Sequence, residues 1–231
     1  MLRRVGVDVV HYPEHHPGHK RVRLLNHHGV DHVFDVGANS GGYARELREF
    51  GYRGDIVSFE PLAEPYRRLR EIADVDPRWT AVNVALGAAS TTAQMNVAAN
   101  SASSSFLPMK DAHRRAAPWA SYVGREDVSV TRLDDVFDVY CKGSVPFLKM
   151  DVQGYEEQVL QGATLSLHLV RGVQLEMSLV PLYERGWVFA EAMLFLEEAG
   201  FTLASLEPGF YDHETGQLLQ VDGIFMRSPR R

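Results

Sequence analysis

A run of polar residues at the end of an apolar segment has the residue types needed for proton transfer. Residues 149–156 read Lys-Met-Asp-Val-Gln-Gly-Tyr-Glu and close a strand that we predict over residues 147–151. Because side chains alternate along a strand, Lys149 and Asp151 fall on the same side of it. Asp151 is therefore a candidate general base or acceptor-positioning group, with Lys149 beside it. The alternative is that Asp151 pairs with Lys149 or caps the next helix.

Two further carboxylates could join Asp151. Glu176 lies at the end of a predicted strand, 173–177, and Asp222 precedes the last predicted strand. In a parallel sheet Glu176 would stand beside Asp151. Carboxylate oxygens suit Mg²⁺, and a bound metal would lower the pKa of an acceptor hydroxyl. Asp151, Glu176 and Asp222 are thus candidate metal ligands, although Glu176 could equally brace a loop.

A glycine-rich turn is the second chemical signal. Residues 35–42 read Asp-Val-Gly-Ala-Asn-Ser-Gly-Gly, between a predicted strand and a predicted helix. Gly37 and Gly41 permit a tight turn, and the amides of the following helix point at the same space. The spacing D-x-G-x-x-x-G matches neither the dinucleotide fingerprint G-x-G-x-x-G nor the phosphate loop of triphosphatases. Both of those classes are therefore disfavoured.

An acidic residue follows this turn at a useful distance. Glu60 comes 23 residues after Gly37, at the end of a predicted strand. A carboxylate about 20 residues beyond such a turn can accept hydrogen bonds from ribose hydroxyls. Asp35, inside the loop, would repel a pyrophosphate and tolerate a cation. A ligand with a ribose, a positive charge and no phosphate describes S-adenosylmethionine. Taken alone, Glu60 could also be a surface carboxylate at a helix N-terminus.

Strands and helices alternate along the chain. We predict strands at 32–36, 56–59, 79–86, 147–151, 173–177, 201–206 and 223–226, and helices at 43–50, 61–73, 133–139, 155–160 and 188–199. This alternation is typical of a mainly parallel sheet covered on both faces, with its ligands at the carboxyl ends of the strands. Segments 92–97 and 128–132 suggest edge strands. Met193, Leu194 and Leu196 are expected in the core.

Residues 98–127 form a long insert, which is often an active-site lid. Its segment 100–106 is rich in serine and could donate hydrogen bonds to a ligand or be a flexible loop. His113 is a second candidate base, because a neutral imidazole suits an alcohol proton. In the loop 208–216, the aromatic rings of Phe210 and Tyr211 could form the floor of an acceptor site, or they could be exposed to solvent.

Composition narrows the class of protein. The chain has 231 residues, 45% of them apolar and 23% charged, which fits a single domain over residues 1–231. A net charge of −6 disfavours a nucleic-acid partner, and the single cysteine, Cys141, excludes an internal disulfide. We see no signal peptide and no apolar run long enough to span a membrane. A cytoplasmic protein is the expectation.

The leading segment, residues 1–31, differs from the rest. Seven of the ten histidines lie within the first 32 residues: His11, His15, His16, His19, His27, His28 and His32. They could form a metal or pH-sensing cluster, or they could be solvated imidazoles around a helix. The segment could cover the site, mediate a homodimer or do neither.

Several motifs together resemble the FkbM family of S-adenosylmethionine-dependent methyltransferases, over roughly residues 22–227. The matching stretches are Val33-Phe-Asp-Val-Gly-Ala-Asn-Ser-Gly-Gly42, Ile56-Val-Ser-Phe-Glu-Pro61, Val84-Ala-Leu-Gly87, Leu133-Asp-Asp135 and Phe147-Leu-Lys-Met-Asp-Val-Gln-Gly-Tyr-Glu156, with weaker matches to Asp222-Gly-Ile-Phe225. The family commonly has Glu where this chain has Gln153. A catalytic carboxylate at that position is therefore absent here.

The resemblance implies an α/β class I methyltransferase fold: a Rossmann-like three-layer sandwich with a seven-stranded, mostly parallel sheet whose last strand is antiparallel. It also implies three groups of cofactor contacts: Asp35, Gly37, Asn39 and Gly41 at the methionine part, Glu60 at the ribose, and Ala85 and Leu86 at the adenine.

The activity implied by the resemblance is O-methylation of a small-molecule hydroxyl, on a sugar, a glycolipid or a polyketide-type product of secondary metabolism. An NAD-dependent oxidoreductase and a non-catalytic cofactor-binding module are the alternatives.

Overall fold

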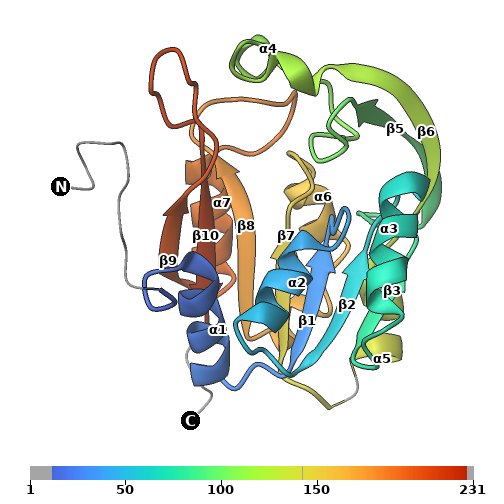
Figure 1. Ribbon diagram of the computed structural model, residues 1–231, viewed down its shortest axis with the longest axis vertical. Helices are drawn as coiled ribbons and strands as arrows, with labels where there is room; N and C mark the ends of the chain where they lie inside the picture. Colours follow the sequence, from blue (N-terminus) through green and yellow to red (C-terminus); the bar gives the residue numbers. More distant parts are fainter. Residues whose placement is uncertain (1–11, 142, 228–231) are drawn as a thin grey trace.

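The computed structural model describes residues 12–141 and 143–227, and a seven-stranded sheet runs through this part of the chain (Figure 1). Its order is β3-β2-β1-β7-β8-β10-β9. The strands are β1 (His32–Val36), β2 (Asp55–Phe59), β3 (Trp79–Val82), β7 (Pro146–Met150), β8 (Gly172–Ser178), β9 (Thr202–Pro208) and β10 (Gln220–Met226). Only β10 runs antiparallel to its neighbours, β8 and β9. The predicted class I methyltransferase architecture is confirmed.

Helices cover both faces of the sheet (Figure 1). One face carries α1 (Pro17–His27), α2 (Gly42–Glu49) and α3 (Ala63–Ala73), and the other carries α5 (Leu133–Tyr140), α6 (Glu156–Gln161) and α7 (Phe189–Glu198). All residues of β1 and β7 are buried, as expected of central strands packed on two sides. On α7, Leu196 is buried but Leu194 is 58% exposed. The expectation that Leu194 lies in the core is wrong. Side chains two positions apart point to different sides of a helix, so Leu194 faces away from the core that Leu196 contacts.

A second, three-stranded sheet contains β4 (Ala85–Leu86), β6 (Tyr122–Thr131) and β5 (Thr91–Ala98), in that order. The predicted strand 79–86 is therefore two strands in two sheets. Asn83 breaks it, because its side-chain amide donates to the carbonyl oxygens of Glu60 and Pro61, both at 2.9 Å. Segments 92–97 and 128–131 are strands, as predicted, but they pair with each other in this small sheet instead of lying at the edges of the main one.

The insert between β5 and β6 lies over the carboxyl ends of the main strands (Figure 1). It spans residues 99–121 and contains α4 (Asp111–Ala116) and a short 3₁₀ helix, Pro118–Ala120. It is shorter than predicted because β6 already begins at Tyr122. Backbone hydrogen bonds fix it to the loop after β8: Lys110 N donates to Leu182 O at 2.8 Å, and Glu184 N to Pro108 O at 2.9 Å.

The leading segment forms α1, which packs on α2. Buried Arg21 anchors it, at 2.5 Å from Glu46 and 3.2 Å from Glu207. His16 caps α1 by accepting from Gly18 N, whereas His32 is buried in β1. Over residues 12–141 and 143–227 no three or more His, Cys, Asp or Glu side chains are grouped so that they could hold a metal ion. His11 lies outside these ranges. Within them no helix is both long enough and apolar enough to cross a bilayer.

A row of polar side chains crosses the sheet beneath α2. Ser58, Asp35, Lys149 and Gln174 are register neighbours on β2, β1, β7 and β8. Lys149 Nζ lies 3.0 Å from Asp35 Oδ1, and Ser58 Oγ donates to Asp35 Oδ2 at 3.0 Å. Burial acts to lower the pKa of Lys149, but the Asp35 carboxylate outweighs it and the pKa is raised. The sheet thus contains a buried ion pair at its centre.

Replacing Lys149 by methionine leaves Asp35 as a buried, uncompensated charge. We expect Lys149→Met to lower the free energy of unfolding by about 3–5 kcal/mol. Adding Asp35→Asn should recover part of this loss, and Lys20→Met, on the exposed side of α1, should change little. Urea unfolding of the four proteins measures this, and a Lys149→Met protein as stable as the native one would contradict the assignment.

Candidate functional site

Two loops meet above the centre of the sheet, one after β1 and one after β7. Gly37 has a φ of +73°, and a Cβ there would collide with the Asp151 carbonyl oxygen. Asp151 N donates to Val36 O at 3.0 Å, and Lys149 Nζ donates to Gly37 O at 3.2 Å. Only glycine permits this approach. The glycine turn and the Asp151 loop are therefore held as one unit.

A first cavity opens beside these loops, with about 590 Å³ of space that includes open solvent. Its lining consists of Val36, Gly37, Asn39, Phe59, Glu60, Pro61, Leu62, Ala85, Leu86, Met95, Ser101, Ala102, Ser104, Phe106, Asp151, Val152, Gln153 and Tyr155. Five of the expected cofactor residues are among them: Gly37, Asn39, Glu60, Ala85 and Leu86. Apolar side chains of β4, β5 and the insert face polar groups of the two loops. That division suits a ligand with a flat apolar ring and a polar tail.

Glu60 is the buried carboxylate of this cavity. Its Oε2 accepts from Asn39 N at 2.8 Å, and its Oε1 accepts from Leu62 N at 2.9 Å. Burial raises its pKa to about 7, although both amides favour the ionised form. Each oxygen retains a lone pair for a further donor. Glu60 is thus held ready to accept hydroxyl hydrogen bonds.

The serine-rich segment of the insert joins the two loops. Asn39 Nδ2 donates to Ser101 Oγ at 3.0 Å, and Ser105 Oγ donates to Gln153 O at 2.8 Å. Ser104 and Ser105 are buried. This segment is therefore a fixed wall of the first cavity in this structure, rather than a detached loop.

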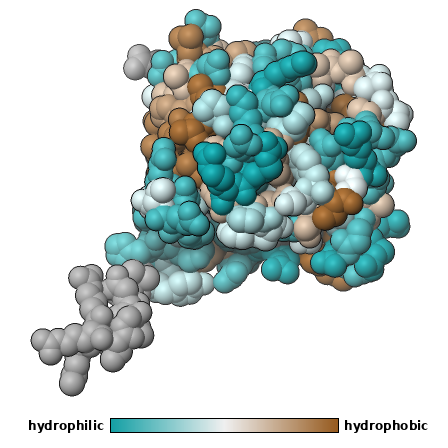
Figure 2. Space-filling model, turned by 90° about the horizontal axis from the view of Figure 1, so that it is seen from above, coloured by the Kyte–Doolittle hydropathy of each residue, from teal (hydrophilic) through white to brown (hydrophobic). Residues whose placement is uncertain are grey.

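A second cavity, of about 640 Å³, adjoins the first. Its lining consists of Asn100, Ala102, Ser103, His113, Ala117, Trp119, Asp151, Gln153, Glu176, Phe210, His213 and Gln220. Ala102, Asp151 and Gln153 line both cavities. Figure 2 views the molecule from the side of the insert, where hydrophilic residues dominate the surface and hydrophobic ones form separate patches. Of the two aromatics expected at this site, Phe210 lines the cavity and Tyr211 does not.

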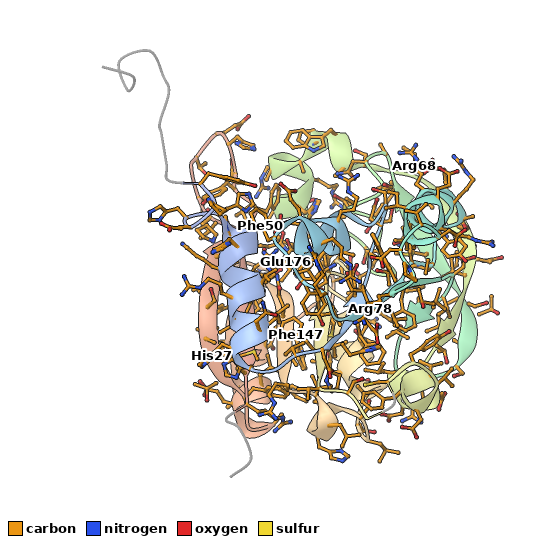
Figure 3. The ribbon with its side chains drawn as sticks, turned by 60° about the horizontal axis from the view of Figure 1, so that its bottom comes forward. His27, Phe50, Arg68, Arg78, Phe147 and Glu176 are labelled. Atoms are coloured by element: carbon orange, nitrogen blue, oxygen red, sulfur yellow. The ribbon has the colours of Figure 1, made fainter. Side chains whose placement is uncertain are left out.

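Gln153 connects the carboxylates of the second cavity. Its Nε2 donates to Asp151 Oδ1 at 2.8 Å and to Glu176 Oε2 at 3.1 Å. Its Oε1 accepts from the Tyr183 hydroxyl at 2.6 Å, and that hydroxyl lies 3.2 Å from His113 Nε2. Figure 3 shows Glu176 toward the centre of the molecule. Sequence reasoning noted Gln153 only as a missing charge, and nothing in the sequence pointed to Tyr183.

The described residues do not fit a Mg²⁺ site formed by the three candidate ligands. The Gln153 amide stands between Asp151 and Glu176 and presents hydrogens, not lone pairs, to both. Asp222 lines neither cavity. It lies inside β10, which begins earlier than predicted, and pairs in register with Glu176. We therefore assign no step to a metal.

Three residues that were expected in the site support it without lining either cavity: Asp35, Lys149 and Gly41. Asp35 is fully buried and engaged by Lys149 and Ser58, so neither side of this ion pair faces a cavity. Gly41 has a φ of +82°, and a Cβ there would come within 3.0 Å of Leu69 and Trp79. The argument that Asp35 itself meets a cationic ligand is corrected: its charge is already balanced by Lys149.

Burial and like charges shape the titration of the remaining groups. The pKa of Glu176 is raised well above its usual range by burial, then by Asp151 and Asp222. Burial raises the pKa of Glu156 to about 7, and its carboxylate caps the Asp151 loop by accepting from Gly154 N at 3.3 Å. Burial lowers the pKa of His113, which favours a neutral imidazole. The half-exposed Asp151 is the carboxylate that both cavities share.

The sheet order and the cavity at the carboxyl ends of β1 and β2 define a class I methyltransferase fold. Residues 35–203 match the model of the methyltransferase FkbM domain. Since this match covers more than half of the chain, the chain belongs to the methyltransferase FkbM domain family.

Among the known proteins that are similar to the chain are two methyltransferases. It is 25% identical over 158 residues to the 2-O-methyltransferase NoeI of Sinorhizobium fredii (strain NBRC 101917 / NGR234), covering 66% of this chain and 65% of that protein. The crystal structure of methyltransferase FkbM from Methylobacillus flagellatus KT superposes with a TM-score of 0.53 at 14% identity, covering 84% of this chain and 44% of that chain. The chain thus spans less than two thirds of each, and the second likeness shows the fold alone.

Removing the Tyr183 hydroxyl tests the connection through Gln153. We expect Tyr183→Phe to lower the free energy of unfolding by about 1–3 kcal/mol, because Gln153 Oε1 loses its donor inside the protein. Tyr211→Phe, at an exposed position, is the matched control and should have little effect. Chemical denaturation followed by tryptophan fluorescence gives both values. Equal effects of the two substitutions would refute the connection.

Proposed function

We propose that this protein is an S-adenosylmethionine-dependent O-methyltransferase. Its acceptor is a hydroxyl of a small molecule of sugar, glycolipid or polyketide type. One observation carries the proposal. A cavity in which Glu60 can accept hydrogen bonds from ribose hydroxyls meets a second, polar cavity at Asp151 and Gln153. Family membership and the distant 2-O-methyltransferase relative support the same reaction.

The first cavity would hold the cofactor, which supplies an electrophilic methyl group on a sulfonium. Glu60 would accept from the two ribose hydroxyls, and Leu86, Met95 and Phe106 would pack on the adenine. The amides and carbonyls of the Gly37 turn would face the methionine part. The methyl group would then lie toward the residues that both cavities share.

Asp151 is the proposed group at the acceptor. Methyl transfer forms a bond from the acceptor oxygen to the methyl carbon and breaks the carbon–sulfur bond, whose electron pair stays on sulfur. The hydroxyl proton must leave, and the Asp151 carboxylate, 46% exposed, can take it and pass it to solvent. Gln153 orients this carboxylate, while Glu176 and the neutral imidazole of His113 line the acceptor side. Alignment of oxygen and methyl group supplies much of the rate.

Calorimetric titration with S-adenosylhomocysteine, with NAD in parallel, tests the cofactor directly. The proposal requires binding of S-adenosylhomocysteine alone, weakened by Glu60→Ala by about 1.5–3 kcal/mol, because a charged acceptor is lost. Glu71→Ala, exposed on α3, is the matched control. Binding of NAD alone would favour an oxidoreductase, and binding of neither would favour a non-catalytic module.

The pKa of Glu60 gives the binding a defined pH dependence. With a pKa of about 7, the carboxyl is protonated at lower pH and must lose its proton before it can accept two hydroxyls. The affinity for S-adenosylhomocysteine should therefore fall as the pH drops below about 7, by up to about tenfold per unit, and be level above it. Glu60→Gln should remove this step. The same step in both proteins would show that another group causes it.

A further inference from the structure

The second cavity has acidic side chains in its lining and, among its described residues, no lysine or arginine to balance them. The acidic side chains are the two carboxylates of Asp151 and Glu176. Lys149 lies closer to Asp35, at 3.0 Å, than to Asp151, at 4.0 Å. Arg21 is engaged by Glu46 and Glu207. The donors that reach the two carboxylates from the cavity lining are neutral amides of glutamine.

Glu176 does not line the first cavity, which would hold the cofactor. A sulfonium in the first cavity would account for a carboxylate at Asp151, which lines both cavities. Glu176, in contrast, lines only the second cavity and is held there by Gln153 and by Gln220 Nε2, at 2.8 Å. Burying a carboxylate without a cation is costly, and its raised pKa reports this cost. Its partner is therefore to be sought in the acceptor.

Other groups of the cavity also suit a cation. Trp119, 56% exposed, and Phe210 line the cavity, and aromatic rings of this kind attract ammonium groups to their faces. Burial lowers the pKa of His113, which disfavours a positive charge on this lining residue. These features are independent of the carboxylates.

From this arrangement we propose that the acceptor carries a protonated amine next to the methylated hydroxyl, as in an amino sugar or another amino alcohol, with Glu176 as its counter-ion. The inference rests on the proposed function and deepens it. Asp151 then faces the hydroxyl, and Glu176 faces the ammonium group. A phosphate group inside this cavity is disfavoured, because the carboxylates of its lining would face it without a lysine or arginine among the described lining residues.

Matched pairs of small probes test this, titrated into the protein saturated with S-adenosylhomocysteine. The pairs are methyl glucosaminide against methyl glucoside, and trans-2-aminocyclohexanol against trans-1,2-cyclohexanediol, with glucose 6-phosphate added. At least one amine should bind ten times more tightly than its neutral partner, and the phosphate should not bind. If no amine shows this preference, or if none binds, the inference is wrong.

Two controls identify the residue and separate the two proposals. Glu176→Gln should reduce the amine preference to within threefold while the affinity for S-adenosylhomocysteine is kept, and Glu198→Gln, on the exposed side of α7, should leave both unchanged. A preference that survives Glu176→Gln overturns the assignment. If S-adenosylhomocysteine itself does not bind, the proposed function fails, and this inference falls with it.

Proton release gives a second readout that needs no variant. Burial, and then the like charges of Asp151, Asp222 and Glu156, raise the pKa of Glu176 well above its usual range, although Gln220 donates to it. An ammonium group that pairs with Glu176 should lower this pKa, so that protons are released when the amine binds. The binding heat of the amine should then vary with the ionisation enthalpy of the buffer, whereas that of the diol should not. An amine heat independent of the buffer would contradict the role of Glu176.

Discussion

The buried ion pair between Lys149 and Asp35 is the contact on which the rest of the site depends. It joins the two central strands, β1 and β7, and the same ammonium group donates to the Gly37 carbonyl. Because a buried charge without a partner is strongly unfavourable, the pair allows one register and one approach of the two loops. The position of Asp151 beside the glycine turn follows from it.

Hydrogen bonds of an uncharged residue connect the loops above this ion pair. Gln153, in a left-handed conformation with a φ of 55°, bridges Asp151 and Glu176 and accepts from Tyr183. Its backbone carbonyl accepts from Ser105 of the insert. The loops after β7 and β8 and the insert are thereby tied together through one side chain and its peptide. A glutamate at this position would donate to neither Asp151 nor Glu176 and would set three carboxylates side by side.

Sequence reasoning was most reliable where local patterns carry the information. The alternation of strands and helices, the glycine turn and the acidic residue after β2 gave the sheet, its first cavity and Glu60. It was least reliable where a side chain's direction depends on distant partners. Asp35 looks like a loop carboxylate in the sequence, yet the pleat turns it toward Lys149, more than a hundred residues away. The roles of Tyr183 and Gln220 arise from contacts between segments that no spacing in the sequence records.

A crystal structure of the complex with S-adenosylhomocysteine would test the central claim most directly, since that claim concerns orientation. The account predicts the ribose hydroxyls on Glu60, the adenine against Leu86, Met95 and Phe106, and the sulfur facing Asp151 and Gln153 across the boundary of the two cavities. A complex with the adenine at Asp151, or with the ligand outside the cavity around Glu60, would contradict it.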